Sequence, residues 1–484
     1  MHFEGSIVMK KWISMLLLTA IFMSFAACNI SSNEDKKKDP YAGQFRVGFG
    51  QATMNPVESV PLGGYGNTST RKSQTITDDM FIRCIALTDE NDNTQLIYSL
   101  DSVRVYAQAL GVIANVAYEL GISYDNMLIN ASHSHSAPDM SSSDPAIERY
   151  LEHFGEQFKA ATLDALADRR PSKMYYGSSE TSGLSWIRHY IMDDGTYGGD
   201  SFGDWDNHYA VAHTADPDTT LHALKFTREG KQDVVLVNWR AHPGLTGGAG
   251  KSLNASSDFV GPFRDVLEDM ADCHVIYVQG NAGNINPGSR MGSEEEYADY
   301  KEYGANLAKY AYEALQDMKE LETGPLQRKT VQLTCEINHD QDHLAGAAVI
   351  VSNVWKTTND RAAVREAGAP YGIRSSYHAN AISQNARRPQ SEELEINVLS
   401  IGNSVGITGA PAELFDRNSM AIEEASPFEV TLSMSYTNGH VGYIPADYVW
   451  EYTSYETDIT RYRRGTAEKI QETMLGMLEE LYGN

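Results

Sequence analysis

Residues 128–138 read Leu-Ile-Asn-Ala-Ser-His-Ser-His-Ser-Ala-Pro, an apolar run that passes directly into two histidines two positions apart. The apolar run predicts a buried strand, and the residues after it predict a loop. In an extended backbone, side chains at positions i and i+2 point to the same side, so His133 and His135 can face one point. This stretch therefore predicts a strand that delivers a histidine pair at its carboxyl end.

Short apolar runs alternate with longer helical patterns along the chain. We expect strands at 96–100, 127–129, 234–237, 275–278 and 405–408, and helices at 103–120, 145–168, 293–321 and 466–481. Ser293 with Glu296 three residues later is a capping-box signal for the third helix. Such alternation is typical of layered α/β proteins, so we predict an α/β fold with a mixed sheet and flanking helices. No linker, low-complexity segment or internal repeat divides residues 43–484, which we expect to form one catalytic unit.

A third histidine follows another predicted strand, in Val237-Asn238-Trp239-Arg240-Ala241-His242-Pro243-Gly244. Open α/β sheets bind ligands at the carboxyl ends of their strands, where loops from several strands meet. His133, His135 and His242 are therefore candidates for one site. The pattern alone leaves open that they are hydrogen-bonded structural histidines.

Two further loops follow apolar runs. The first, Gln279-Gly280-Asn281-Ala282-Gly283-Asn284-Ile285-Asn286-Pro287, is rich in Gly and Asn, which adopt the left-handed backbone of tight turns. Such a loop can present backbone N–H groups to an oxyanion, and an ordinary tight connection is the alternative. The second, residues 409–415, brings Glu413 to the edge of the sheet, although an acidic residue there also suits a helix N-terminus.

Composition excludes several classes of protein. With 484 residues, 42% of them hydrophobic and 21% charged, the chain is not disordered, collagen-like or a small disulfide-stapled scaffold. Its 39 Lys and Arg residues against 65 Asp and Glu residues give a net charge of -26, so we expect no nucleic-acid partner. None of the cysteines lies in a C-x-x-C pair, so we expect any metal site to use histidine and carboxylate.

The N-terminus resembles a lipoprotein export signal. Met9-Lys10-Lys11 supplies a basic segment, residues 13–25 form an apolar segment too short to span a bilayer, and Phe25-Ala26-Ala27-Cys28 resembles a bacterial lipobox. We expect a signal peptide over 1–27, acylation of Cys28 and a flexible tether over 28–42. The protein would then be an extracytoplasmic lipoprotein, held to the bacterial membrane on its periplasmic or cell-surface face. A plain secretory signal with a chance cysteine is the alternative.

Taken in order, these segments resemble the neutral/alkaline, non-lysosomal ceramidase family, whose members hydrolyse the amide of N-acylsphingosine. The residues that carry the resemblance are Val47-Gly48-Phe49-Gly50, Pro61-Leu62-Gly63-Gly64-Tyr65-Gly66, Leu100-Asp101, His133-Ser134-His135-Ser136-Ala137-Pro138, Asn238-Trp239-Arg240-Ala241-His242, Pro411-Ala412-Glu413-Leu414-Phe415, Tyr443-Ile444 and Tyr455-Glu456. They extend over nearly all of the chain beyond the tether. The chain thus resembles the catalytic domain of a divergent bacterial member.

The resemblance implies a metal site. One Zn²⁺ per chain would be held by His133, His242, Glu413 and Tyr443, with one position left for water. Neutral imidazoles and a carboxylate suit Zn²⁺, which lowers the pKa of a bound water toward 7. The implied reaction is attack of zinc-bound hydroxide on the acyl carbonyl.

The resemblance also implies catalytic residues. His135, Arg188 and Tyr455 would hold the substrate and stabilise the tetrahedral intermediate, whereas a salt-bridged surface arginine and a packed tyrosine are the alternatives for the last two. Where the family has G-D-V-S-P-N, this chain has Gly283-Asn284-Ile285-Asn286-Pro287, so amides replace an acid and a hydroxyl. We include Asn284 and Asn286 among the candidate catalytic residues as hydrogen-bond donors, because an amide cannot act as nucleophile or base.

Three functions remain open on these residues. The first is a zinc-dependent amidohydrolase that cleaves N-acylsphingosine (ceramide) or a similar N-acylated lipid. The second keeps the zinc but acts as an esterase or deacetylase on a carbohydrate or another small polar substrate, which the changed Asn284 and Asn286 positions favour. The third is a surface lipoprotein that binds a ligand without catalysis. A shared scaffold does not choose among them.

Overall fold

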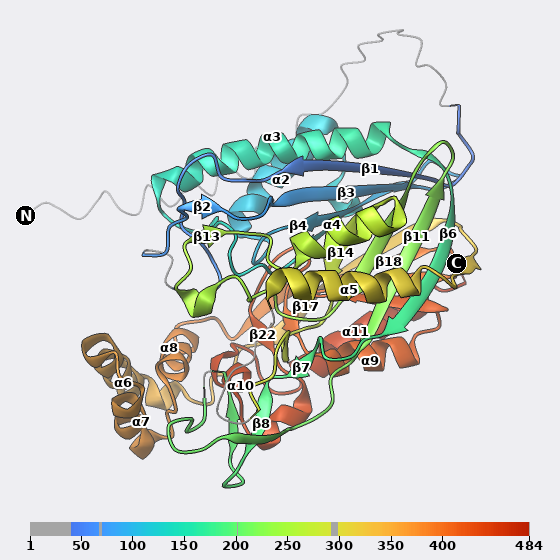
Figure 1. Ribbon diagram of the computed structural model, residues 1–484. Coiled ribbons are helices and arrows are strands. Elements are labelled where there is room, and N and C mark those ends of the chain that lie inside the picture. The colour runs from blue at the N-terminus through green and yellow to red at the C-terminus, as the bar shows by residue number, and fades with distance from the viewer. Residues whose placement is uncertain (1–39, 67–69, 201, 292–298, 484) are drawn as a thin grey trace, which may run out of the picture. The chain divides into compact units, whose positions relative to one another are not determined.

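The computed structural model describes residues 40–66, 70–200, 202–291 and 299–483 (Figure 1). The chain divides into two compact units, Met1–Pro40 and Tyr41–Asn484. Of the first unit only Pro40 is described, so the signal peptide, Cys28 and most of the tether lie outside the described residues and stay predictions. In the described part of the chain, no helix combines the length and apolarity needed to cross a membrane.

The second unit contains three copies of one topological pattern. Each repeat has three antiparallel strands, a helix, a fourth strand parallel to the third, and a second helix. Repeat one comprises β1 (Arg46–Thr53), β3 (Phe81–Thr88), β4 (Thr94–Leu100), α2 (Ala107–Leu120), β5 (Met127–Ala131) and α3 (Pro145–Ala167). Repeat two comprises β6 (Arg170–Glu180), β11 (Thr220–Arg228), β12 (Lys231–Trp239), α4 (Val260–Ala271), β14 (Cys273–Gln279) and α5 (Tyr300–Ala314). Repeat three comprises β17 (Leu326–Glu336), β18 (Ser391–Ile401), β19 (Val405–Gly409), α9 (Asp416–Ala425), β21 (Val430–Met434) and α11 (Thr466–Leu481).

The repeats form two main sheets. Repeats one and two share a nine-stranded sheet, counted over the described residues, in the order β14-β12-β11-β6-β1-β3-β4-β5, with β16 (Lys319–Leu321) paired to β6. They join where Arg46 and Val47 of β1 pair with Pro171 and Arg170 of β6. Repeat three forms a separate four-stranded sheet in the order β17-β18-β19-β21. These mixed sheets with flanking helices confirm the predicted α/β class.

Each repeat packs its helices against its own strands, as Figure 1 shows for α2 and α3 beside β1 and β3. The close approach requires glycine under the second helix. A Cβ atom on Gly50 of β1 would lie 2.1 Å from the backbone oxygen of Ala161, and one on Gly177 of β6 would lie 1.9 Å from that of Ala314. The other strand faces bury a central apolar core shared by all three repeats.

Most predicted elements are present. Strands β4, β5, β12, β14 and β19 contain the five apolar runs, and α3 and α11 match their predicted spans to within one residue. Helix α2 begins at Ala107 and not at residue 103, because the chain bends at residues 103 and 104 and is extended at Tyr106. Helix α5 begins after its N-cap Asp299 and ends at Ala314, and residues 319–321, predicted as helix, form β16 because they pair with the edge of β6. The capping-box pair Ser293 and Glu296 lies outside the described residues.

Each repeat carries an insertion between its first and second strands. The second strand is antiparallel to the first and third, so this connection lies at the carboxyl ends of the first and third strands. Insertion one, residues 54–80, contains β2 (Thr75–Ile76). Insertion two, residues 181–219, contains β7 (Trp186–Ile187), β8 (His189–Met192), β9 (Tyr197–Gly199) and β10 (Ala210–His213). Insertion three, residues 337–390, contains α6 (Ala345–Thr358), α7 (Arg361–Gly368) and α8 (Ser376–Asn385).

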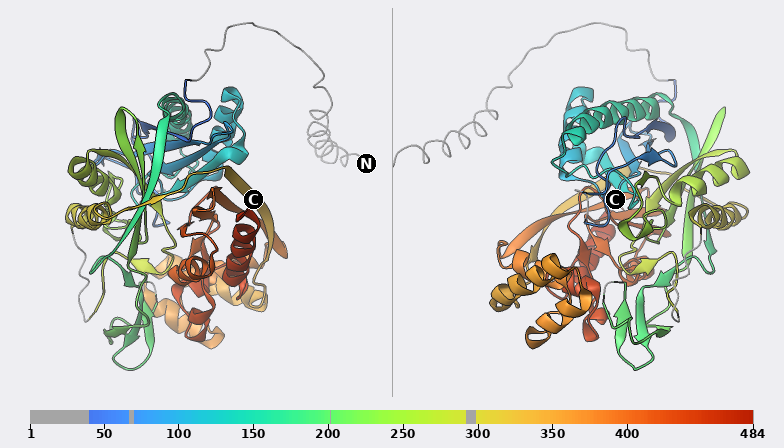
Figure 2. Two further views of the ribbon diagram at one scale, coloured as in Figure 1. Left: turned by 90° about the vertical axis from the view of Figure 1, so that its right-hand side faces the viewer. Right: turned by 60° about the vertical axis from the view of Figure 1, so that its left-hand side comes forward.

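Short elements join the insertions to the loops at the strand ends. Strand β13 (Asn254–Ala255) pairs with β2, β15 (Ile285–Asn286) pairs with β7, and β20 (Glu413–Leu414) pairs with β22 (Tyr443–Ile444). Helix α10 (Tyr455–Ile459) follows β22. In Figures 1 and 2, insertions two and three lie toward the same end of this unit.

A buried hydrogen-bond set joins the carboxyl ends of β5, β14 and β21. The Asn130 amide donates to the backbone oxygen of Ser435 at 2.6 Å and accepts from the backbone N–H of Gln279 at 2.8 Å. The Ser435 N–H in turn donates to the Gln279 oxygen at 3.1 Å. One residue from each repeat contributes, and all three are completely buried. The three strand ends therefore meet at one point.

An ion pair joins repeats one and two beside this point. Asp101, just after β4, accepts from the guanidinium of Arg264 in α4 at 2.9 and 2.6 Å, and also from the Phe81 N–H at 2.8 Å. Both charged side chains are buried. Removing one partner of such a pair leaves an uncompensated buried charge, which costs more than the pair contributes.

We predict that Asp101→Asn lowers the free energy of unfolding by about 3 kcal/mol or more, because Arg264 keeps its charge and loses its counter-ion. Urea unfolding followed by circular dichroism measures the change. The matched control is Asp340→Asn, whose contact with Arg463 is solvent-exposed and should contribute little. Equal effects of the two substitutions would contradict the structural role of the buried pair.

Candidate metal centre

The three strand-end histidines meet. The ring nitrogens that His133, His135 and His242 can offer lie within 4.8 Å of one another, and the Nε2 atoms of His133 and His135 are 3.0 Å apart. His133 and His135 follow β5 of repeat one, and His242 follows β12 of repeat two. The convergence of the parallel strand ends brings together side chains that are more than 100 positions apart in the sequence. This buried group can bind a metal ion.

Backbone acceptors fix two of the rings. His133 Nδ1 lies 2.6 Å from the carbonyl oxygen of Val103, and His242 Nδ1 lies 3.0 Å from that of Ile285. A carbonyl only accepts, so Nδ1 carries the hydrogen in each ring and Nε2 keeps its lone pair. This arrangement is the usual support behind a metal-ligating histidine. It also explains why residues 103–106 stay outside α2.

Burial keeps the rings neutral. It lowers the pKa of His133 well below its ordinary value, and burial together with the nearby His242 lowers the pKa of His135 to about 3. Metal ions bind the unprotonated imidazole, so these rings are ready to act as ligands at neutral pH without first losing a proton.

Glu413 supplies the negative charge. Its Oε2 lies 3.5 Å from the Nε2 atoms of both His133 and His242, and its Oε1 accepts from His440 Nε2 at 2.9 Å. Burial opposes the charged carboxylate, but the hydrogen bond from His440 favours it, and the pKa of Glu413 lies well below its usual range. Two nitrogen lone pairs and an anionic oxygen repel one another unless a cation lies among them. The donor set therefore fits a divalent metal such as zinc.

Two tyrosines complete the centre. Tyr443 is the register partner of Glu413 in the β20–β22 pair, and its hydroxyl lies 3.4 Å from His242 Nε2. The ring of Tyr436 stacks on His133 with centroids 4.1 Å apart, and its hydroxyl lies 3.5 Å from Glu413 Oε2. The predicted ligands thus lie together, and their individual roles stay predictions.

Tyr436 and His440 are absent from the sequence-based candidates. A signal for His440 exists, because the alternating apolar residues of β21 are followed by the turn pair Asn438-Gly439 and then by the histidine. Tyr436 has no such signal. His133, Tyr436 and Asn438 all have left-handed backbones, with φ values of 70°, 52° and 56°. Such conformations are uncommon outside glycine and persist where the surroundings impose them, often at functional sites.

A glycine of insertion one makes room for His135. A Cβ atom on Gly64, whose φ is 105°, would lie 2.7 Å from the Cβ of His135. The ring of Tyr65 meets His135 edge-on at 5.1 Å, and the Tyr65 hydroxyl donates to the Gly244 oxygen at 3.0 Å. Gly64 in Pro61-Leu62-Gly63-Gly64 therefore allows this loop to contact His135.

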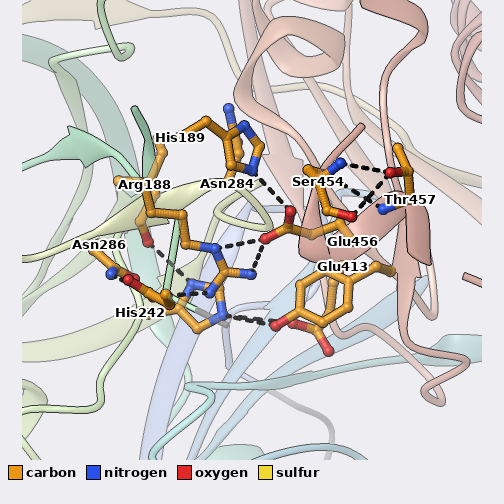
Figure 3. A network of polar contacts seen from close by, with 12 residues as sticks. Arg188, His189, His242, Asn284, Asn286, Glu413, Ser454, Glu456 and Thr457 are labelled. Atoms are coloured by element: carbon orange, nitrogen blue, oxygen red, sulfur yellow. Dashed lines mark hydrogen bonds and ion pairs between the residues drawn. The ribbon is translucent and has the colours of Figure 1, made fainter. Parts of the chain in front are cut away.

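Arg188 comes from insertion two and points to the same centre (Figure 3). Its Nε and Nη2 atoms lie 2.7 and 2.5 Å from Glu456 Oε1, while His189 Nε2 lies 2.7 Å from Glu456 Oε2. The guanidinium lies over the ring of Tyr443 at 5.2 Å. Although Glu456 is buried, Arg188 and His189 hold its pKa below the usual range. The carboxylate thus fixes one edge of the guanidinium.

The other candidates lie around this pair. Tyr455 is the first residue of α10 and follows the N-cap Ser454, whose capping box with Thr457 is drawn in Figure 3. Its ring lies 5.8 Å from that of Tyr443. Asn284 donates to Asp416 at 2.7 Å, and its backbone oxygen accepts from the Arg188 N–H at 3.0 Å. Its amide thus bonds to repeat three, and its backbone positions Arg188.

Asn286 donates to Asp200 Oδ2 at 2.8 Å, and the same oxygen lies 4.0 Å from Arg188 Nη1. Asp200 is a further acidic residue near the centre that sequence reasoning missed, because a single acid in a loop carries no signal. The catalytic assignments of Asn284 and Asn286 stay predictions.

We predict that the purified protein binds about one equivalent of zinc per chain. His133→Ala and His242→Ala should abolish binding, because they remove ligands whose rings are already oriented by backbone carbonyls. Elemental analysis after dialysis measures the content. His343→Ala, an exposed histidine outside the centre, is the control and should keep its metal. Unchanged metal in both site variants, with circular dichroism of the folded protein, would show that the cluster is not the binding site.

We also predict that Glu456→Gln destabilises the fold by about 3 kcal/mol at pH 7, because Arg188 then lies buried without a counter-ion. The folded-state pKa of Glu456 lies below its unfolded value of about 4.3, so the ionised form stabilises the protein above that pH. The difference from wild type should shrink as the pH falls below about 4. Urea titrations from pH 3 to 7 test this, with the exposed Glu336→Gln as control. A difference independent of pH would exclude the charge as its origin.

Solved structures of known proteins share the fold of this chain. No protein-family model matches the chain, and no curated protein is similar to it in sequence. Among solved structures, neutral ceramidase from Pseudomonas aeruginosa is similar, with 16% identity and a TM-score of 0.66 over 91% of this chain and 75% of that one. A ceramidase complexed with C2 is also similar, with 18% identity and a TM-score of 0.64 over 91% of this chain and 76% of that one. The chain therefore has a ceramidase-like fold, as its resemblance to that family predicted.

Proposed function

We propose that this protein is a zinc-dependent hydrolase that cleaves the acyl bond of an N-acylated substrate of the ceramide type. The observation that carries the proposal is the pair of Nε2 atoms of His133 and His242, both fixed by backbone acceptors, that face the ionised Glu413 at 3.5 Å. A buried carboxylate that faces two imidazole Nε2 atoms is a poor way to stabilise a fold but a good metal site. The ceramidase-like fold supports the amide as the bond cleaved.

In this proposal His133, His242 and Glu413 hold the ion, with Tyr443 beside them. When bound, zinc supplies a Lewis acid and lowers the pKa of a water toward 7. His135 is neutral at pH 7 and lies 3.0 Å from His133, so it can accept a proton or a substrate hydrogen bond without first being deprotonated.

In this proposal Arg188 and Tyr455 donate hydrogen bonds to the carbonyl oxygen of the substrate. Glu456 contacts Nε and Nη2 of the guanidinium, which leaves Nη1, 4.0 Å from Asp200, as the donor for the substrate. A positively charged donor held before the reaction stabilises an oxyanion without reorganisation. Burial raises the pKa of Tyr455, so its hydroxyl stays protonated and can donate a second hydrogen bond.

An ester or acetamide on a carbohydrate is the second candidate substrate. The observation that favours it is Asn284, which stands where the family has an acid and whose amide is bonded to Asp416 and Tyr448. We further propose that the protein works outside the cytoplasm, anchored through acylated Cys28, on the strength of residues 9–28 alone.

We predict release of fatty acid from a short-chain fluorescent ceramide, loss of this activity on chelation and its return with zinc. Arg188→Lys should lower kcat about 100-fold or more, because an ammonium cannot keep both the contacts with Glu456 and the contact with the oxyanion. Arg149→Lys, at an exposed ion pair, is the matched control and should leave kcat unchanged.

The outcomes separate the candidates. Bound zinc without ceramide cleavage, but with chelator-sensitive cleavage of 4-nitrophenyl acetate, would replace the amide by an ester substrate. Absence of zinc and of both activities would overturn the hydrolase and favour a lipoprotein that only binds its ligand.

A further inference from the structure

A cavity of about 660 Å³ lies between insertions two and three, outside the metal centre. Its wall comes from residues 196, 197 and 202–206 of insertion two, from insertion three with its helices α6, α7 and α8, and from Tyr452 and Thr453. The three repeats contribute none of their own strands or helices to it. Figures 1 and 2 show these two insertions at the same end of the unit. The cavity is therefore a feature of the parts added to the scaffold.

Aromatic side chains dominate this wall. They are Tyr197, Phe202, Trp205, Trp355, Tyr377 and Tyr452. Tyr197 stacks on Tyr452 with centroids 4.5 Å apart, and Trp205 Nε1 donates to two backbone oxygens at 2.9 Å, so these rings are fixed. Tyr197 and Tyr377 are 41% and 45% exposed, which leaves ring surface open to a ligand.

The wall also contains charged side chains, among them Asp204, Asp206 and Arg365. Arg365 Nη2 lies 3.1 Å from Asp206 and 3.9 Å from Asp204 Oδ1. That Asp204 oxygen is buried and has no hydrogen-bond partner among the described residues. The aliphatic part of the wall is small, with Val364 and Ile373 as its largest members.

This lining decides between two kinds of ligand. An acyl chain would cover the guanidinium and carboxylates without offering them hydrogen bonds, which is unfavourable. A sugar ring has an apolar C–H face that packs on an aromatic ring and hydroxyl groups at its edge that bind Asp and Arg. A wall that contains both aromatic rings and planar charged groups matches the sugar and not the chain.

The cavity is linked to the metal centre by two contacts. The Tyr452 hydroxyl lies 3.3 Å from His189 Nδ1, and His189 is bonded through Glu456 to Arg188. Tyr377 meets Tyr455 edge-on at 5.6 Å. The wall of the cavity therefore contacts the residues that surround Arg188.

We infer that this cavity binds a sugar ring, and that it holds the saccharide part of a substrate whose acyl group lies at the metal centre. The binding itself stands on the cavity alone, whereas its place in a reaction rests on the proposed hydrolase.

The first experiment measures binding to chelator-treated full-length protein, so that no turnover is needed. Cellobiose, maltose, lactose and N,N′-diacetylchitobiose are titrated while tryptophan fluorescence is followed, with Trp205 and Trp355 as reporters in the wall. At least one saccharide should bind saturably. Tyr197→Ala should weaken this binding about tenfold by removing a stacking ring, and Arg365→Gln should weaken it as well. Tyr118→Ala, an 83% exposed tyrosine on α2, is the matched control and should bind like wild type.

Two results overturn the inference. One is that no saccharide binds, or that Tyr197→Ala and Tyr118→Ala bind equally. The other is that N-hexanoylsphingosine binds in place of sugars with the same dependence on Tyr197, which would make the cavity an acyl-chain site.

A second experiment separates this inference from the proposed function. In zinc-loaded protein, Tyr197→Ala should lower kcat/KM for glucose pentaacetate about tenfold and leave that for 4-nitrophenyl acetate unchanged. Saccharide binding without hydrolysis of either ester would remove the hydrolase and keep the cavity. Hydrolysis of both esters without any effect of Tyr197→Ala would keep the hydrolase and reject the role of the cavity in substrate binding.

Discussion

The contact on which the site depends is the hydrogen-bond set among Asn130, Gln279 and Ser435. Each residue belongs to a different repeat, and each bond satisfies a polar group that has no access to water. A buried polar group left without a partner costs about 1–3 kcal/mol, so the strand ends cannot separate without a large penalty. His133 lies three residues beyond Asn130, and His440 lies five residues beyond Ser435. These hydrogen bonds therefore fix the positions of the strand ends, and with them the positions of the histidines that could bind a metal.

The repeats and the insertions supply different residues of the candidate site. The repeats deliver histidines and Glu413 from strand ends, where helices and sheets leave little freedom. The insertions start from the same edge and contribute Gly64, Arg188 and the aromatic cavity. Because loops tolerate change more readily than packed strands, one scaffold can keep its metal ligands while its substrate changes. This division is consistent with a ceramidase-like fold at 16% identity.

The sequence was sufficient for features that depend on local pattern. Apolar runs at 96–100 and 127–129 marked strands because both faces of a parallel pair are buried. The histidines were found because they follow those strands directly. The threefold topology was not predictable, since it repeats the order of elements and not residues. The start of α2 was misplaced because the carbonyl of Val103 serves His133, a partner 30 positions away.

Tyr436 and Asp200 could not be predicted from the local sequence either, because long-range contacts bring them to the site. Tyr436 enters the site by stacking on His133, and Asp200 enters it through Asn286 and Arg188. Neither contact has a sequence spacing that a motif can encode. The resemblance to ceramidases placed Arg188 and Tyr443 because it carried long-range information that periodicity lacks.

Tyr443 joins the two halves of the candidate site. Its hydroxyl lies 3.4 Å from His242, on the metal side, and its ring lies under the guanidinium of Arg188, on the anion-binding side. Because Tyr443 pairs in register with Glu413, any shift of this strand pair moves the carboxylate and the arginine platform together. His242 and Arg188 thus both contact one side chain, so their separation depends on Tyr443. In the proposed hydrolase, this coupling would keep the metal ligands and the arginine aligned, as acyl transfer requires of a rigid site.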